Sequence, residues 1–94
     1  MSIFADENSR VIVQGITGKE GSFHTKSCLD YGTKILGGVT PKKGGEKIFD
    51  LPVFNTVKEA VNGLNADTSM IFVPAKFASG AIREAAEGGI KTII

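Results

Sequence analysis

The chain has 94 residues, a length typical of one domain. Hydrophobic residues make up 41% of it and charged residues 22%, which is ordinary for a soluble globular protein. Eleven lysines and arginines face ten acidic residues, so the net charge is +1. This composition gives no reason to expect a nucleic acid or an anionic membrane surface as a partner.

The first predicted element is a buried parallel strand over residues 11–16, which are apolar and rich in β-branched side chains. It runs into glycines at positions 15, 18 and 21, followed by a predicted helix over 22–31 that ends at Gly32. A glycine turn between a strand and a helix lets the backbone approach a phosphate, and the first helical amides point at it. We therefore expect Gly18 and Gly21 to lie where backbone meets the phosphate of a nucleotide.

The spacing of these glycines differs from that of the dinucleotide fingerprint. The fingerprint places glycines at its first, third and sixth positions. Here they stand at the first, fourth and seventh positions of the motif. The pattern thus favours a nucleotide other than NAD.

Strands and helices continue to alternate through the rest of the chain. A second strand is predicted over 34–39, and a polar loop over 40–50 follows it. The later elements are a strand at 52–54, a helix at 56–61, a strand at 69–73 stopped by Pro74, a helix at 77–87 and a strand at 91–94. Asn55 or Thr56 caps the second helix, where Thr56 and Glu59 have the spacing of a capping box.

Such alternation predicts an α/β fold, a Rossmann-like doubly wound parallel sheet with strand order 3-2-1-4-5. The whole chain, residues 1–94, forms this one domain. The last strand ends apolar and uncapped at Ile94, where a native sheet continues into a ligand loop. We therefore expect the chain to be a truncated piece of a longer subunit.

The loop after the second strand carries information about the ligand. An NAD-binding fold has an acid near this point that contacts the ribose. This sequence has Lys42 and Lys43 instead, between Pro41 and two glycines. Lysine there suits a phosphate on the ribose, as in NADP or coenzyme A. The alternative is that both lysines belong to a solvated loop.

Five segments together are more selective than the glycines alone. They resemble the N-terminal CoA-binding domain of the succinate–CoA ligase alpha subunit, and the resemblance extends from Met1 to Ile94 without a gap. The segments are Gln-Gly-Ile-Thr-Gly-Lys-Glu-Gly at 14–21, Tyr-Gly-Thr-Lys at 31–34, Gly-Gly-Val-Thr-Pro-Lys-Lys-Gly-Gly at 37–45, Leu-Pro-Val-Phe-Asn-Thr-Val at 51–57 and Ile-Phe-Val-Pro-Ala at 71–75.

The resemblance implies an ADP- or GDP-forming ligase of the tricarboxylic acid cycle, which joins a dicarboxylate to CoA through a phosphohistidine. It also implies a set of CoA-binding residues, in which the first four line the phosphates, Lys43 binds CoA and the last three flank the nucleotide end. This set is Thr17, Gly18, Lys19, Glu20, Lys43, Pro41, Val73 and Pro74.

The resemblance also implies what lies outside this chain. The phosphohistidine belongs to a second domain beyond residue 94, so His24 is not that residue and we expect no catalytic residue here. Magnesium and ATP or GTP bind on the partner beta subunit, so this chain has no metal site. The fragment alone is therefore expected to be inactive.

The other conspicuous side chains have simpler interpretations. His24, Cys28 and Tyr31 are spaced to share one helix face, and we expect that face to pack on the sheet because one His and one Cys are too few ligands for zinc. Glu84 and Glu87 are interpreted as a solvated helix face. Glu20 is an acid beside a predicted phosphate site, which suggests that it accepts hydrogen bonds from backbone or from a ligand hydroxyl.

The compartment follows from what the sequence lacks. Cys28 is the single cysteine, which excludes an internal disulfide and favours a reducing compartment. Residues 1–8 resemble neither a secretory signal nor a transit peptide, and no apolar run approaches the roughly 20 residues that cross a bilayer. We predict a cytoplasmic protein without a membrane partner.

Two alternatives to the ligase alpha subunit stay open at this point. One is the matching domain of a related NDP-forming acyl-CoA synthetase or citrate-cleaving enzyme. The other is a freestanding nucleotide-binding module with a regulatory role and no catalysis.

Overall fold

The most buried strand, β1, lies in the middle of a parallel sheet, as its apolar β-branched residues require. The computed structural model describes residues 8–94. Its elements in chain order are β1 (Val11–Gln14), α1 (Lys19–Asp30), β2 (Ile35–Val39), β3 (Lys47–Ile48), β4 (Leu51–Phe54), α2 (Val57–Leu64), β5 (Thr68–Ile71), α3 (Ala75–Glu87) and β6 (Thr92–Ile93).

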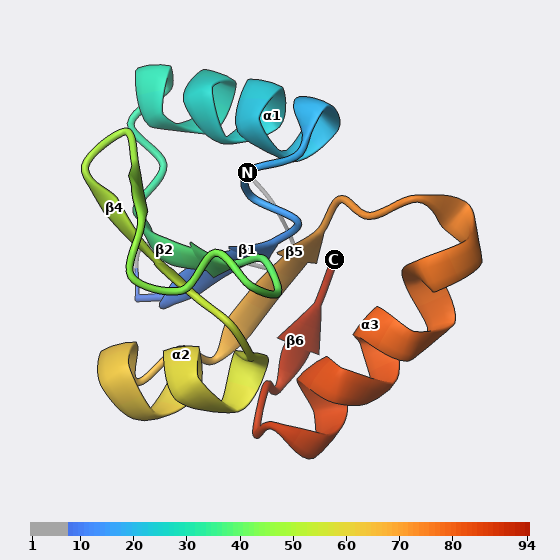
Figure 1. The fold of residues 1–94 in the computed structure, drawn as a ribbon. Coiled ribbons are helices and arrows are strands. Elements are labelled where there is room, and N and C mark those ends of the chain that lie inside the picture. Colours follow the sequence, from blue (N-terminus) through green and yellow to red (C-terminus); the bar gives the residue numbers. More distant parts are fainter. Residues whose placement is uncertain (1–7) are drawn as a thin grey trace.

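The sheet has the order β3-β4-β2-β1-β5-β6, and every neighbouring pair except β3 and β4 is parallel (Figure 1). Without β3, this is the predicted order 3-2-1-4-5, so the Rossmann-like fold is confirmed. The prediction of 40–50 as a loop was wrong for β3. This two-residue strand is too short to show a periodic pattern, and its hairpin turn uses Phe49 and Asp50 at positive φ.

Helix ends also differ from the expected ones. The first helix begins at Lys19 rather than at residue 22, because Gly21 is accommodated inside it. The second continues to Leu64 and ends at Asn65, which adopts the left-handed conformation that closes many helices. The third begins at Ala75, directly after Pro74. The end of the third helix at Glu87, before Gly88, was predicted correctly, whereas the strand predicted to run to Pro74 ends at Ile71.

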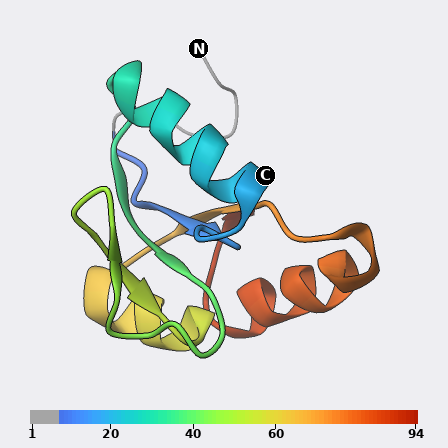
Figure 2. The ribbon, with the colours of Figure 1, turned by 45° about the horizontal axis from the view of Figure 1, so that its top comes forward.

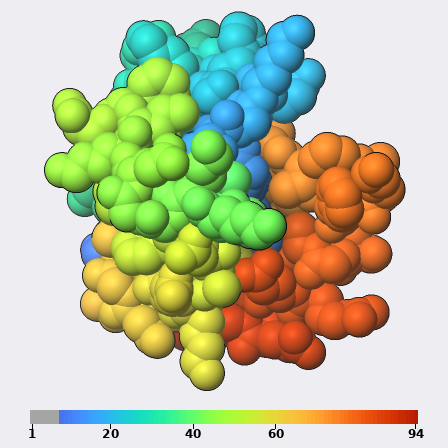
Figure 3. All heavy atoms as spheres, viewed as in Figure 1, coloured from blue at the N-terminus to red at the C-terminus, as the bar shows by residue number. Residues whose placement is uncertain are grey.

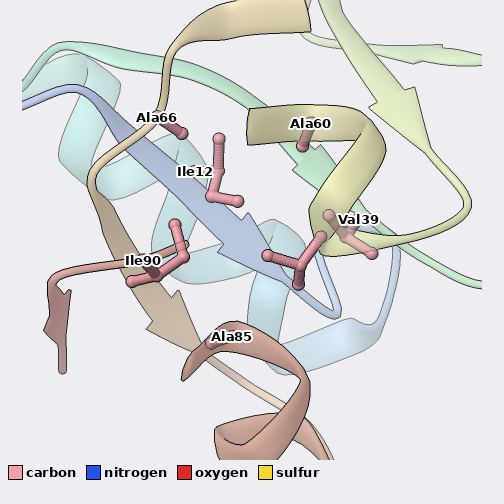
Figure 4. Close-up of a cluster of buried hydrophobic side chains, with 7 residues drawn as sticks. Ile12, Val39, Ala60, Ala66, Ala85 and Ile90 are labelled. Atoms are coloured by element: carbon pink, nitrogen blue, oxygen red, sulfur yellow. The ribbon is translucent and has the colours of Figure 1, made fainter. Parts of the chain in front are cut away.

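Two apolar clusters cover the two faces of the sheet. Alternate residues of β1 point to opposite faces, so Val11 and Val13 pack toward α1 while Ile12 packs toward α2 and α3. Figures 1 and 2 show α1 on one side of the sheet and the other two helices on the opposite side. The cluster around Ile12 gathers small residues, with Ala60 and Ala85 bringing the two helices close to the strand (Figure 4). Within residues 8–94, no helix has the length and apolar character needed to cross a membrane.

Candidate nucleotide-binding site at the carboxyl edge of the sheet

The loops that follow β1, β2 and β5 meet at one edge of the sheet, because parallel strands end on the same side. After β1 the chain enters α1 on one face, and after β5 it enters α3 on the other face. In Figure 3 the blue atoms near residue 15 lie between the green atoms near residue 40 and the orange atoms near residue 75. Where two neighbouring strands of a parallel sheet continue to opposite faces, as β1 and β5 do, a crevice forms at the carboxyl edge, and α/β proteins bind ligands there.

The three glycines of the first loop have different roles. Gly15 has a φ of 82°, and a Cβ there would lie 2.3 Å from the Phe72 carbonyl oxygen. Gly21 is buried, and a Cβ on it would lie 2.0 Å from the Gly15 carbonyl oxygen. Gly18 is exposed and has ordinary extended backbone, and a Cβ on it would lie 3.3 Å from the Gly15 carbonyl oxygen. Packing alone therefore requires glycine at 15 and 21, whereas Gly18 leaves the first turn of α1 uncovered.

The N-terminus of α1 has no side-chain cap, because its capping residue is Gly18. Its first amides, on Lys19, Glu20 and Gly21, have no carbonyl one turn earlier in the helix to bond. The loop closes on itself through backbone bonds, from Gly18 N–H to the Gly15 carbonyl at 3.0 Å and from Ser22 N–H to the Gly18 carbonyl at 2.8 Å. The positive end of the helix dipole thus faces the crevice, which suits an anion.

Two threonines join the first loop to the second. Thr17 Oγ1 and Thr40 Oγ1 are 3.0 Å apart, and the Thr17 amide donates to Thr40 Oγ1 at 3.3 Å. The Thr40 amide in turn donates to the Phe54 carbonyl at 3.0 Å. Thr40 was not among the predicted site residues, although its position between the second strand and Pro41 was a usable signal. These bonds bring the predicted residues Thr17 and Pro41 to neighbouring loops.

The lysine loop is exposed to solvent, and its backbone is held in place by hydrogen bonds. The Lys43 amide donates to the Thr40 carbonyl at 3.1 Å, which closes a turn through Pro41 and Lys42. Beyond it, the Gly44 amide donates to Asn55 Oδ1 at 2.9 Å. Asn55 therefore supports this loop, and Thr56 rather than Asn55 caps α2. The Lys43 ammonium lies 3.9 Å from a Glu46 carboxylate oxygen.

The third loop brings Val73 and Pro74 to the same edge. The Phe72 amide donates to the Gln14 carbonyl at 2.9 Å, which extends the pairing of β1 with β5. Val73 Cγ1 would lie 3.1 Å from a Cβ on Gly15, so this half-buried side chain borders the glycine loop. Pro74 is the exposed capping residue of α3, which also has no side-chain cap.

A buried polar pair fixes the distance between these elements. The Ser69 hydroxyl donates to Gln14 Oε1 at 2.6 Å, and Gln14 Nε2 donates to the Ala81 carbonyl of α3 at 3.0 Å. Both side chains are buried, so their polar groups are satisfied inside the protein. The side chains of Gln14 and Ser69 therefore connect β1, β5 and α3 beneath the site rather than facing a ligand.

A hollow of about 660 Å³ opens beside the site, between the loop at Pro41, the start of α2 and the end of α3. Yellow-green and orange-red atoms meet there in Figure 3. Pro41 is the only predicted site residue in its lining, which comprises Pro41, Asn55, Thr56, Lys58, Glu84, Glu87 and Gly88. The interpretation of Glu84 as solvated surface was wrong, because Glu84 Oε2 accepts a hydrogen bond from the Val57 amide at 2.8 Å. Glu87 is exposed, as expected.

The histidine–cysteine–tyrosine face is only partly as predicted. Tyr31 is 92% exposed, because α1 ends at Asp30 and Tyr31 is its C-cap. Cys28 packs against the core on the α1 side of the sheet, and the His24 ring stacks on Phe72 with centroids 4.7 Å apart. Glu20 Oε2 lies 3.4 Å from His24 Nε2. Among the residues from 8 to 94, no three His, Cys, Asp or Glu side chains cluster as metal ligands would.

Residues 6–94 match the family described as the CoA binding domain. The chain belongs to the CoA-binding domain family. This membership confirms the predicted resemblance and agrees with the open helix N-terminus beside a lysine loop.

Known members of this family share more than half of the sequence. The chain is 58% identical to "Succinate--CoA ligase [ADP-forming] subunit alpha 1" of Archaeoglobus fulgidus over all 94 residues. It is 55% identical over the same length to alpha subunits of that ligase from Aquifex aeolicus and from Staphylococcus aureus Mu50. The 94-residue chain covers only 31–32% of the length of these relatives, about a third.

Solved structures show the same fold at lower identity. A Rex-family repressor, RSP, superposes with a TM-score of 0.75 at 23% identity, covering 90% of this chain and 43% of its own. A conserved hypothetical protein from Pyrococcus furiosus superposes with a TM-score of 0.68 at 25% identity, covering 87% and 69% respectively. These neighbours support the Rossmann-like fold of this CoA-binding domain.

Proposed function

We propose that this chain binds coenzyme A as the CoA-binding domain, residues 1–94, of an ADP- or GDP-forming succinate–CoA ligase alpha subunit. The observation that carries the proposal is the uncapped N-terminus of α1, open beside the lysine loop in a chain of this family. Identity of 55–58% to ligase alpha subunits supports the substrate assignment.

In this proposal CoA contacts three loops. The amides of Lys19, Glu20 and Gly21, with Thr17 beside them, hold the pyrophosphate at the positive end of α1. Lys43, in the second loop, binds a phosphate of CoA as a point charge on a flexible side chain. Pro41 on one side, and Val73 with Pro74 on the other, flank the nucleotide end. Because Gly18 has no side chain, the phosphate can approach these amides closely.

In this proposal the chain binds a substrate and does none of the chemistry. The phosphohistidine belongs to a second domain of the subunit. The beta subunit is the partner and binds Mg²⁺ and ATP or GTP. The compartment is cytoplasmic, which the single cysteine supports. The purified chain is therefore inactive in succinate- and nucleotide-dependent formation of CoA thioester, and turnover lost in His24→Ala would contradict the assignment.

The direct test is calorimetric titration of the chain with CoA, dephospho-CoA and NAD, alongside a thermal melt that shows it is folded. CoA should bind, and NAD should bind much more weakly or not at all. Lys43→Ala should weaken CoA binding about tenfold or more, because a hydrogen bond to a charged group contributes roughly 1.5–3 kcal/mol. Equal affinity for NAD and CoA, or none for CoA, would contradict the proposal.

A further inference from the structure

Lys42 has a backbone conformation that lysine rarely adopts. In the part of the chain that the structure describes, four non-glycine residues have positive φ: Lys42, Phe49, Asp50 and Asn65. Asn65 closes α2, and Phe49 with Asp50 form the tight turn between β3 and β4. Lys42, at a φ of 71°, follows proline in a turn whose third position favours glycine. A lysine thus occupies a position where the backbone would be less strained with glycine.

The two lysines of this loop differ in their charge partners. The Lys43 ammonium lies 3.9 Å from the Glu46 carboxylate, so part of its charge is balanced within the loop. Lys42 is exposed and forms no ion pair with any residue between 8 and 94. Lys42 is therefore the cation whose full charge this loop offers to a ligand.

The position of the turn is fixed relative to the predicted phosphate site. Thr40, the first residue of the turn, is hydrogen-bonded to Thr17 of the glycine loop. Pro41 lines the neighbouring hollow and fixes its own φ, so the backbone entering Lys42 is restricted. The turn thus holds Lys42 beside the edge where the nucleotide end of the ligand is proposed to bind.

We propose that Lys42 is a specificity-determining residue that recognises the ribose 3′-phosphate of CoA, an inference that rests on the proposed CoA-binding function. This phosphate is a dianionic monoester that dephospho-CoA lacks. Within residues 8–94 Lys42 has no carboxylate partner, whereas the Lys43 ammonium has the Glu46 carboxylate 3.9 Å away, so Lys42 is the better-suited cation for this dianion. Lys43 then contacts the pyrophosphate that both ligands share.

The test compares CoA with dephospho-CoA on four proteins: the wild-type chain, Lys42→Gly, Lys42→Ala and Lys42→Arg. Lys42→Gly should weaken CoA binding about tenfold, in the range of a lost charge-assisted hydrogen bond, and change dephospho-CoA binding less than twofold. Its melting temperature should be equal to or above that of the wild type, since glycine relaxes the turn. Lys42→Ala should lose the same affinity without that relief, and Lys42→Arg should retain most of it.

Lys34→Ala is the matched control, because it removes an equal charge from an exposed lysine at the amino end of β2, on the opposite edge of the sheet. It should leave both affinities unchanged. An unchanged ratio of CoA to dephospho-CoA affinity in Lys42→Gly would overturn the inference, and so would equal weakening of both ligands. Wild-type protein that binds both ligands equally would also overturn it while leaving the proposed function intact. Wild-type protein that binds neither would overturn both.

Discussion

The N-termini of α2 and α1 show two ways of treating the same physical problem. Every helix begins with amides that have no partner within the helix. At α2, Thr56 Oγ1 accepts from the Glu59 amide at 3.2 Å, and Glu59 Oε1 accepts from the Asn55 amide at 3.2 Å. Glu84 reaches across from α3 to accept from the Val57 amide at 2.8 Å. This helix start is therefore closed by side chains of the chain itself.

At α1 no side chain serves this purpose, although an acid is present. Gly18 offers no oxygen, and Glu20 in the first turn has its carboxylate 3.4 Å from the His24 ring. The two helix starts therefore differ in whether side chains of the protein bond their first amides. The α2 start stabilises the fold, and the α1 start leaves its first amides without a side-chain partner, as the proposed binding of a phosphate requires.

The largest expected effect concerns the packing beneath the open helix start. Gly21→Ala should lower the free energy of unfolding by about 1–3 kcal/mol, because its Cβ would overlap the Gly15 carbonyl oxygen. The control is Gly80→Ala in α3, where a Cβ would have no neighbour within 4 Å. That change should stabilise the chain by up to about 1 kcal/mol. Urea unfolding of both variants measures the difference, and equal midpoints would contradict the packing role of Gly21.

Removing the long-range cap should have the next largest effect. Glu84→Ala leaves the Val57 amide without its carboxylate partner, at a cost of about 1–2 kcal/mol. Glu87→Ala removes an exposed acid three residues along the same helix, and should change stability by less than about 0.5 kcal/mol. CoA affinity should be unaffected in both. If Glu84→Ala melts like Glu87→Ala, the bond to Val57 contributes nothing to stability.

Thr56→Ala removes the local cap and should cost about 1 kcal/mol, the usual value for a threonine N-cap. Chemical denaturation followed by circular dichroism measures it. A double variant with Glu84→Ala should lose less than the sum of the two, because both bonds hold the same first turn. Strict additivity would show that the two caps act independently.

The two helix starts also show what the sequence can predict. The Thr56 cap depends on residues three positions apart, and the parallel strands depend on short β-branched runs, so both were predicted correctly. The role of Glu84 depends on a contact between residues 27 positions apart, which no local pattern reveals. The bond between Thr17 and Thr40 spans 23 positions and was missed for the same reason.

The glycine motif was informative but incompletely interpreted. It correctly indicated a tight turn between β1 and α1. It could not show that Gly15 and Gly21 are glycine because of contacts with Phe72 and with each other. Those contacts arise only when β5 and α1 pack around the turn. The assignment of the individual CoA-binding residues stays a prediction.

The smallest expected change in stability comes from giving α1 the kind of cap that α2 has. In Gly18→Ser the backbone at Gly18, with φ −72° and ψ 167°, already suits an N-cap serine. The serine hydroxyl should accept from a first-turn amide and raise the free energy of unfolding by a few tenths of a kcal/mol. CoA should bind several-fold more weakly, because that amide is then occupied and the added side chain narrows the approach. Calorimetry and thermal melts of the same preparation measure both effects. Thr33→Ser, at an exposed position between α1 and β2 and away from the three loops of the site, controls for a general effect of substitution. A gain in stability with unchanged CoA affinity would mean that the amides at the start of α1 do not hold the phosphate.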